Sequence, residues 1–375
     1  MMQECSRRIG ILGGTFNPVH AAHIAMAKGV KKLLSLDEVL LIVAQDPPHK
    51  QVQGHVDALL RYKMVCLASK TSDGLVPCDI EMKRPGKSYT TDTLHELKLQ
   101  YPGTQWFVIV GSDMLQDLPT WRNAPDLLKE AVFVAVPRQG QNEADEQAAQ
   151  MLRKEYNADV RLVSLDIPPI SSTQVRANME QALPITGLVS PAVERFIYEK
   201  GLYLPEQVKR MQEKCRAALN TNRYKHTMGV VRMAAALAQR HGVDPVQARL
   251  AALLHDCGRG VDKGPLTHAI TGERIAREDY GITDKAVLQA IRRHTTLGIS
   301  ATKLDKLIYL ADMVEYGRKY KGVEELRQLA MENLDEAAIK GLTDTILYVQ
   351  EKGLEVHSDS INALHELGIS VPLNQ

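Results

Sequence analysis

Two histidines follow a glycine-rich segment near the start of the chain. The segment runs Gly13-Gly14-Thr15-Phe16-Asn17-Pro18-Val19-His20, reaches His23 three residues later, and is followed by helical spacing of apolar residues. Glycine lets a backbone approach a phosphate closely, and the N–H groups of a helix N-terminus stabilise an anion. Because the two imidazoles share one face of the first turns, both can donate hydrogen bonds to a triphosphate. The segment predicts a phosphate site, although an isolated histidine pair of this spacing would as readily cap a helix or lie on the surface.

A second group of polar residues lies near the end of the first half. Ser171, Ser172 and Thr173 stand at a predicted helix start, and Arg176 follows one turn later. Taken alone, this pattern is more typical of a helix cap with a surface arginine. Together with the glycine-rich segment it predicts a nucleotide site at the carboxyl ends of parallel strands.

A third group consists of histidines and aspartates in the second half of the chain. A single histidine on an apolar helix is usually a core residue. Four histidines and two aspartates in one helical region instead predict a metal centre between facing helices, with Fe, Mn, Zn, Co or Ni rather than Ca²⁺ as the ion. The predicted ligands are His226, His255, Asp256, His268, His294 and Asp312.

The elements that must position these residues differ between the two halves. Residues 7–204 alternate β-branched runs with helical patterns, which predicts a parallel sheet covered on both faces. From Pro205 onward helix-period patterns dominate, which predicts an all-α region that begins with a helix. The expected strands are Ile9–Leu12, Glu38–Ala44, Val76–Glu81, Trp106–Gly111, Val132–Val136 and Arg161–Asp166.

Length and composition limit the class of protein. A chain of 375 residues predicts two domains, which we place at residues 1–204 and 205–375. The 46 Lys and Arg nearly balance the 45 Asp and Glu, which favours small phosphorylated ligands over nucleic acid or an anionic membrane. The five scattered cysteines form no C-x-x-C pair, and 18 apolar residues never run together, so we expect a cytoplasmic protein without a disulfide framework.

The first half resembles the nucleotidylyltransferase superfamily, through G-G-T-F-N-P-V-H-x-x-H and I-S-S-T-x-x-R. Intermediate motifs such as P-P-H-K, S-Y-T-T-D-T-L, G-S-D, L-P-T-W and V-P-R narrow the resemblance to bacterial nicotinate-nucleotide adenylyltransferases, over roughly residues 8–204. One departure is Ala22, where that family commonly has glycine.

The resemblance implies a Rossmann-like α/β domain that transfers AMP from ATP, bound with Mg²⁺, to nicotinate mononucleotide. The product is deamido-NAD, and pyrophosphate is released. Catalysis would then rest on positioning and on charge stabilisation by His20, His23 and Arg176. The implied ATP-binding residues are Gly13, Gly14, Thr15, Phe16, His20, His23, Ser171, Ser172, Thr173 and Arg176, and the implied acceptor-binding residues are Lys50, Thr90, Thr91, Asp113, Trp121 and Arg138.

The second half resembles the HD phosphohydrolase superfamily, and more closely the HD-domain hydrolases that cleave diadenosine tetraphosphate symmetrically to two ADP. The motifs are R-Y-x-H-T, L-L-H-D, L-T-H-A-I-T-G, A-I-x-x-H-T-T and Y-L-A-D-x-x-E-x-G-R. The resemblance implies two metal ions, of iron or another transition metal, that share Asp256 as a catalytic ligand and activate a water. Arg259 and Arg318 would bind the polyphosphate.

Several features leave alternatives open. Only eleven residues join Asp256 to His268, where a further helix is expected, Arg259 replaces a usual lysine, and Tyr316 stands where proline is common. The second domain is alternatively a nucleotide sensor, or it cleaves another phosphoester. The first domain could adenylylate another acceptor such as phosphopantetheine, although Trp121 and the Thr90-Thr91 pair favour nicotinate.

Overall fold

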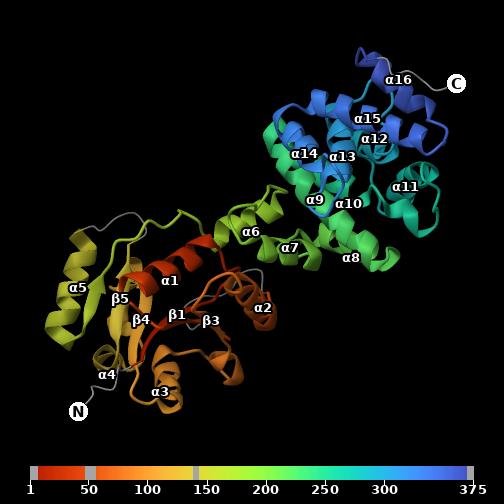
Figure 1. The fold of residues 1–375 in the computed structure, drawn as a ribbon. Coiled ribbons are helices and arrows are strands. Elements are labelled where there is room, and N and C mark those ends of the chain that lie inside the picture. Colours follow the sequence, from red (N-terminus) through yellow and green to blue (C-terminus); the bar gives the residue numbers. More distant parts are fainter. Residues whose placement is uncertain (1–6, 47–55, 138–142, 370–375) are drawn as a thin grey trace. The chain divides into compact units, whose positions relative to one another are not determined.

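The computed structural model describes residues 7–46, 56–137 and 143–369 of the chain. These residues form two compact units (Figure 1). The first unit contains the described residues up to Arg176 together with Thr186–Glu194, and the second contains Ala177–Ile185 and the described residues from Arg195 onward. The domain boundary expected at residues 204 and 205 stays a prediction, because compactness alone does not define where a functional domain ends.

The first unit is built on a sheet of six strands in the order β3-β2-β1-β4-β5-β6. Every neighbouring pair is parallel, which confirms the predicted parallel α/β sheet. Two strands are shorter than expected, because β3 gives way to a 3₁₀ turn and the edge strand β6 pairs only with Phe133–Ala135. The strands are β1 (Arg8–Gly14), β2 (Glu38–Val43), β3 (Leu75–Cys78), β4 (Gln105–Gly111), β5 (Val132–Val136) and β6 (Val160–Leu162).

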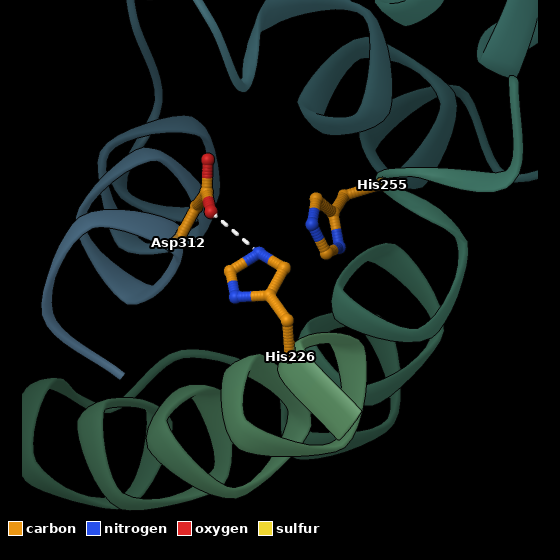
Figure 2. A group of neighbouring side chains, drawn as sticks. All are labelled: His226, His255 and Asp312. Atoms are coloured by element: carbon orange, nitrogen blue, oxygen red, sulfur yellow. Dashed lines mark ion pairs between the residues drawn. The ribbon is translucent and has the colours of Figure 1, made fainter. Parts of the chain in front are cut away.

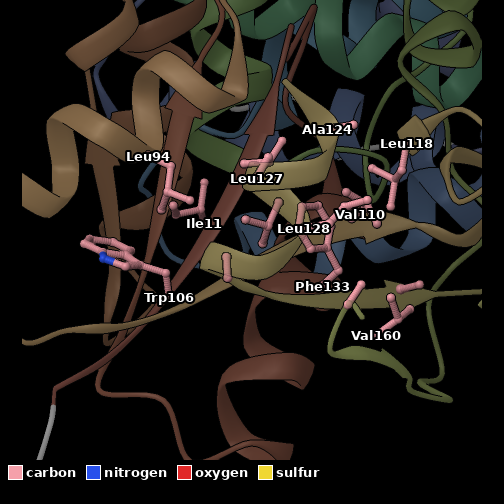
Figure 3. Close-up of a cluster of buried hydrophobic side chains, with 14 of the residues drawn as sticks. Ile11, Leu94, Trp106, Val110, Leu118, Ala124, Leu127, Leu128, Phe133 and Val160 are labelled. Atoms are coloured by element: carbon pink, nitrogen blue, oxygen red, sulfur yellow. The ribbon is translucent and has the colours of Figure 1, made fainter. Parts of the chain in front are cut away.

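Helices connect these strands and cover the sheet. Alternate strand residues, such as Ile11 and Phe133, pack with Leu94 of α3 and Leu127 of α4 in one apolar cluster (Figure 3). From β1 the chain adds β2 and β3 on one side of the sheet, and from β4 it adds β5 and β6 on the other side. The loops after β1 and β4 therefore separate, and a ligand-binding crevice is expected between them at the carboxyl ends of these strands. The helices between the strands are α1 (Ala21–Leu33), α2 (Ala58–Ser69), α3 (Thr90–Gln100), α4 (Ala124–Glu130) and α5 (Glu143–Tyr156), with 3₁₀ turns η1 (Ile80–Lys83), η2 (Ser112–Met114) and η3 (Leu118–Thr120). Two further helices follow β6, α6 (Ser172–Glu180) and α7 (Pro191–Lys200), and each has residues in both units.

The second unit is helical throughout its described residues, as the sequence predicts. Apolar residues of α9 such as Val230 and Leu237 are buried, as are Leu307 and Leu310 of α13, so the longest helix lies in the centre of this unit. The helices are α8 (Glu206–Ala218), α9 (Thr221–His241), α10 (Pro245–Leu254), α11 (Thr267–Glu278), α12 (Lys285–Arg293), α13 (Lys303–Val314), α14 (Val323–Glu332), α15 (Leu334–Glu351) and α16 (Ser358–Glu366), with the 3₁₀ turn η4 (Cys257–Gly260). Across the described parts of the chain, each helix lacks the length or the apolar character needed to cross a bilayer.

Candidate functional site

The glycine-rich loop begins where β1 ends. Nothing lies within 4 Å of the position that a Cβ atom would take on Gly13, so the backbone there is open to a ligand. A Cβ atom on Gly14 would lie 3.3 Å from the ring of Phe16, which itself has a φ of 47°. The ring therefore packs back over the loop, and a larger residue at position 14 would push it away.

The two predicted phosphate-binding histidines are stacked at the start of α1. His20 is the N-cap residue, and its ring centroid lies 3.7 Å from that of His23. The backbone N–H of His20 donates to Nδ1 of His23 at 3.3 Å. Because Nδ1 of His23 accepts a hydrogen bond, the proton of the neutral ring lies on Nε2, the tautomer that can donate to a phosphate oxygen.

The structure brings the two predicted nucleotide motifs together. Ser172 donates from Oγ to the carbonyl of Pro18 at 2.8 Å, and Arg176 donates from Nη1 to the carbonyl of Asn17 at 2.7 Å. A further hydrogen bond of 3.2 Å joins Arg176 to the hydroxyl of Thr173. These contacts fix the start of α6 against the loop that follows β1.

The hydroxyl of Ser171 caps helix α6, whereas that of Ser172 contacts the loop after β1. The Ser171 hydroxyl accepts a hydrogen bond of 3.1 Å from the backbone N–H of Gln174, which caps the first turn of α6. Ser171 was predicted as an ATP-binding residue, and that role stays a prediction. The capping contact shows that the three predicted hydroxyls are not equivalent.

The predicted acceptor residues lie around the start of α3. Thr90 is its first residue, and the hydroxyl of Thr91 donates to the carbonyl of Arg122, directly after Trp121. Trp121 is half-buried against the apolar cluster of the sheet. Asp113 lies in η2, just beyond the carboxyl end of β4. The predicted residues Lys50 and Arg138 lie outside the described residues.

All six predicted metal ligands converge in the second unit. His226 lies on α9, His255 and Asp256 follow α10, His268 lies on α11, His294 follows α12, and Asp312 lies on α13. One ligand atom from each of His226, His255 and Asp312 lies within 4.8 Å of the other two (Figure 2). The same holds for His255, Asp256 and His294, so the two triads share His255.

His268 completes the cluster next to Asp256. Its Nε2 atom lies 3.3 Å from Oδ1 of Asp256 and 3.1 Å from Nε2 of His294. These side chains are buried, with His255, His268 and His294 at most 2% exposed. Polar groups this close and this buried require a shared cation, either a proton or a metal ion.

The orientation of three of the four imidazoles fits metal ligation. Nδ1 of His255 donates to the carbonyl of Ala252 at 2.7 Å, and His268 and His294 make equivalent contacts with backbone carbonyls. A carbonyl can only accept, so these three rings carry their proton on Nδ1 and present the lone pair of Nε2 to the cluster. Hydrogen bonds of this kind orient metal-ligating histidines and fix their tautomer.

The pKa values of the cluster also favour metal ligation. Burial, with a smaller contribution from His255, lowers the pKa of His294 to about 4, so this ring is neutral at pH 7 and able to ligate. Burial raises the pKa of Asp256 and of Asp312, but neighbouring histidines outweigh it and hold both pKa values far below the usual range. Both aspartates are therefore ionised, as metal ligands must be.

His226 differs from the other three histidines. Burial lowers its pKa, but hydrogen bonds with Asp312 and Glu315 raise it, and the net pKa lies above the usual value. Its Nε2 atom lies 2.8 Å from Oδ1 of Asp312, and its Nδ1 atom lies 3.3 Å from Oε1 of Glu315. A metal ion on Nε2 would replace the proton that now joins His226 to Asp312.

Comparisons with known proteins match each half separately. A cytidylyltransferase-like family model matches residues 11–178, and an HD domain model matches residues 223–317. A Synechococcus sp. (strain JA-3-3Ab) protein named "Probable nicotinate-nucleotide adenylyltransferase" is 41% identical over 201 residues, which are 53% of this chain and 95% of that protein. A protein of the same name from Shouchella clausii (strain KSM-K16) is 38% identical over 197 residues, which are 52% of this chain and 97% of that protein.

This chain belongs to the nicotinate-nucleotide adenylyltransferase family. The match to these relatives covers about half of the chain, and the other half contains an HD domain. A solved structure from Clostridium acetobutylicum, titled as a predicted HD superfamily hydrolase involved in NAD metabolism, is 32% identical, covers 43% of this chain and 96% of that chain, and has a TM-score of 0.41. We refer below to the adenylyltransferase unit and to the HD domain.

The short connector of the HD domain has a structural explanation. Between Asp256 and His268 the chain forms only η4 and a turn. A Cβ atom on Gly258 would lie 2.2 Å from the carbonyl oxygen of His268, so η4 and α11 approach each other at backbone distance. Asp262 accepts a hydrogen bond from the backbone of Gly264 at 2.8 Å and caps the turn. The short connector therefore leaves the ligands of the HD domain in one cluster.

The two arginines predicted to bind polyphosphate both lie beside the cluster. Arg318 forms an ion pair of 2.6 Å with Oδ1 of Asp312. Nε of Arg259 lies 3.6 Å from Oδ1 of Asp256, and its Nη1 atom donates to the connector carbonyls of Lys263 and Gly264, each at 3.1 Å. Their role toward a phosphate stays a prediction.

Sequence reasoning missed one buried arginine of the adenylyltransferase unit. Arg61 of α2 is 1% exposed and donates to the carbonyl of Thr15 at 2.6 Å and to that of Ala44 at 2.9 Å. It thereby holds the glycine-rich loop against the end of β2. In the sequence it stands in an ordinary helical pattern, so only its charge in an apolar helix could have drawn attention to it.

Glu315 is a second residue to which the sequence analysis assigned no role, and its position depends on a glycine. Glu315 is 5% exposed, and a Cβ atom on Gly229 would lie 2.2 Å from its Oε2 atom. We therefore expect Gly229→Ala to push the carboxylate away from His226 and to weaken metal binding by about 10–100-fold, the usual effect of losing an outer contact of a metal ligand. Metal titration of the full chain would measure this. Gly242→Ala is the comparison for a general loss of stability, because its φ of 67° strains the backbone while no atom lies within 4 Å of its Cβ position. Unchanged affinity in Gly229→Ala would contradict the orienting role of Glu315.

Proposed function

We propose that the adenylyltransferase unit transfers AMP from ATP to nicotinate mononucleotide, giving deamido-NAD and pyrophosphate. The observation that carries this proposal is the joining of its two nucleotide motifs. Ser172 and Arg176 of α6 are hydrogen-bonded to the loop that leads to His20. Family membership supports the same reaction, because the curated relatives carry this activity in their names.

The chemistry follows from the positions of the donors. The phosphate of nicotinate mononucleotide attacks the α-phosphorus of ATP, and the bond to pyrophosphate breaks in line with the attack. His20, His23 and Arg176 would donate to phosphate oxygens on which charge increases in the transition state. Mg²⁺ bound to the triphosphate would neutralise part of its charge. Since no covalent enzyme intermediate is needed, the contribution of the chain is positioning and charge stabilisation.

The start of α3 suits a carboxylate acceptor. The first N–H groups of a helix lack partners within the helix and favour an anion. The hydroxyl of Thr90 stands at this position, and Trp121 lies close by through the contact of Thr91 with the backbone of Arg122. An indole stacks well on a pyridinium ring. A helix start for the carboxylate and an indole for the pyridinium ring together favour nicotinate mononucleotide over an acceptor that has neither group.

Competing acceptors provide the test. The full chain would be supplied with ATP, Mg²⁺ and either nicotinate mononucleotide or phosphopantetheine, and pyrophosphate release would be followed for each. We expect turnover with nicotinate mononucleotide to be strongly preferred. A preference for phosphopantetheine would overturn the proposed acceptor.

We also propose that the HD domain holds two ions of iron or another transition metal and cleaves diadenosine tetraphosphate symmetrically to two ADP. Its support is the donor set, in which buried Nε2 atoms and two ionised carboxylates converge. The six predicted ligands would hold the two ions, with the carboxylate of Asp256 shared between them. Such ions lower the pKa of a bound water and neutralise charge on phosphate oxygens.

Anaerobic purification of the full chain, followed by metal analysis and product identification, tests this second proposal. Bound iron and two ADP from each diadenosine tetraphosphate are expected. ATP and AMP as products would contradict symmetrical cleavage. Bound metal without any cleavage would favour the alternative functions, a nucleotide sensor or a hydrolase of another phosphoester.

A further inference from the structure

Arg223 is a third arginine at the metal cluster of the HD domain, and no predicted role accounts for it. It lies on α9, one turn before His226, and its Nη1 atom lies 2.8 Å from Oδ2 of Asp256. The side chain of Asp256 is 3% exposed, whereas that of Arg223 is 36% exposed. The guanidinium group therefore stands on the solvent side of a buried carboxylate, where an incoming ligand would meet it.

The charges around the cluster show why this arginine would change partners. Among the described residues, the three carboxylates of Asp256, Asp312 and Glu315 are accompanied by three guanidinium groups, those of Arg223, Arg259 and Arg318. These groups balance one another in charge. Two divalent ions would add four positive charges, and the ion pair between Arg223 and Asp256 would weaken because metal and guanidinium would compete for one carboxylate.

A negatively charged substrate can compensate the positive charge that the metal ions would add. A tetraphosphate chain between two nucleosides carries about four negative charges, one for each bridging phosphate, whereas a phosphomonoester carries about two. Guanidinium groups bind phosphate through paired hydrogen bonds, and Arg223 is exposed enough to make them.

We propose that Arg223 is a polyphosphate-binding residue of the HD domain, which exchanges Asp256 for a substrate phosphate when metal ions bind. The inference rests on the proposed metal-dependent function of this domain. It also deepens that function, because it couples metal loading to the binding of a polyphosphate.

Two titrations of the full chain test the exchange. The first follows binding of Mn²⁺ alone, through the electron paramagnetic resonance signal of the free ion. The second follows binding of a diadenosine tetraphosphate analogue with a methylene group between its second and third phosphorus atoms, with and without Mn²⁺. The variants are Arg223→Ala, Arg223→Lys and, as a matched control, Lys225→Ala, which removes the same charge from an exposed position of α9.

We expect Arg223→Ala to bind Mn²⁺ several-fold more tightly, because a competitor for Asp256 is lost. In the presence of Mn²⁺ its affinity for the analogue should fall about 10–100-fold, the effect of one charge-assisted hydrogen-bonded contact. Arg223→Lys should recover part of that affinity, and Lys225→Ala should match the unaltered chain in both titrations. Should Arg223→Ala fail to fold, Arg223→Gln keeps the polar bulk and is expected to behave in the same way.

The opposite results separate this inference from the function on which it rests. Weaker Mn²⁺ binding by Arg223→Ala, or unchanged affinity for the analogue, would show that Arg223 only orients Asp256 and would overturn the exchange. Failure of the unaltered chain to bind Mn²⁺ would overturn both the metal centre and the exchange. The expected titrations without cleavage of diadenosine tetraphosphate would contradict the hydrolase alone.

Discussion

His255→Ala should abolish metal binding and phosphohydrolase activity in the HD domain and leave deamido-NAD synthesis unchanged. His255 is fully buried, and its ligand atom lies within 4.8 Å of those of His226, Asp256, His294 and Asp312, so its loss removes a ligand from the centre of the cluster. Removing an outer contact of a metal ligand already costs about 10–100-fold in metal affinity, so removing a ligand itself should cost more. Metal content and both activities would be measured on the same preparation.

A matched histidine of the same domain provides the control. His241 of α9 lies 2.7 Å from the carbonyl of Ala330 through Nε2, outside the metal cluster. His241→Ala should therefore keep its metal and its phosphohydrolase activity. Full metal content in His255→Ala would refute the proposed ligand set. Loss of both activities in that variant would show instead that the two active sites are coupled.

The metal cluster was largely predictable from the sequence, because its ligands are of unusual types for their setting. Histidine and aspartate are unusual in apolar helical runs, and the structure brings all six into one cluster. Arg223 and Glu315 could not be recognised in this way. A charged residue near a helix end is ordinary in a sequence, and only the packing of α9 beside α10 and α13 shows which carboxylate or imidazole it contacts.

The sheet was predictable for a similar reason. Buried parallel strands appear as continuous apolar runs, and β4 and β5 lie within one residue of their expected bounds. The ends of β3 and β6 were not predictable, since a strand ends where the neighbouring strand no longer provides backbone hydrogen-bond partners. The close approach of η4 to α11 was not predictable either, because the need for a glycine at position 258 arises from the backbone of α11 that lies against it in the folded chain.

The largest expected effect in the adenylyltransferase unit is that of His20→Ala. We expect kcat for deamido-NAD synthesis to fall by about 10²–10³, the usual result of removing one donor that stabilises charge in the transition state. The change should appear in kcat more than in the KM for ATP, because the interaction strengthens as charge develops on the phosphate oxygens. Cleavage of diadenosine tetraphosphate by the same preparation should be unaltered.

Two further variants separate catalysis from positioning. His20 also stacks on His23 and begins α1, so its removal could act by displacing His23. His20→Phe keeps an aromatic ring that can stack on His23 but has no N–H group to donate, so activity recovered in this variant would assign the defect to positioning. His95→Ala, at an exposed position of α3, should keep full activity. A loss of less than about tenfold in His20→Ala, well below the effect expected for a transition-state donor, would remove His20 from the catalytic residues and leave His23 and Arg176 as the donors to the reacting phosphate.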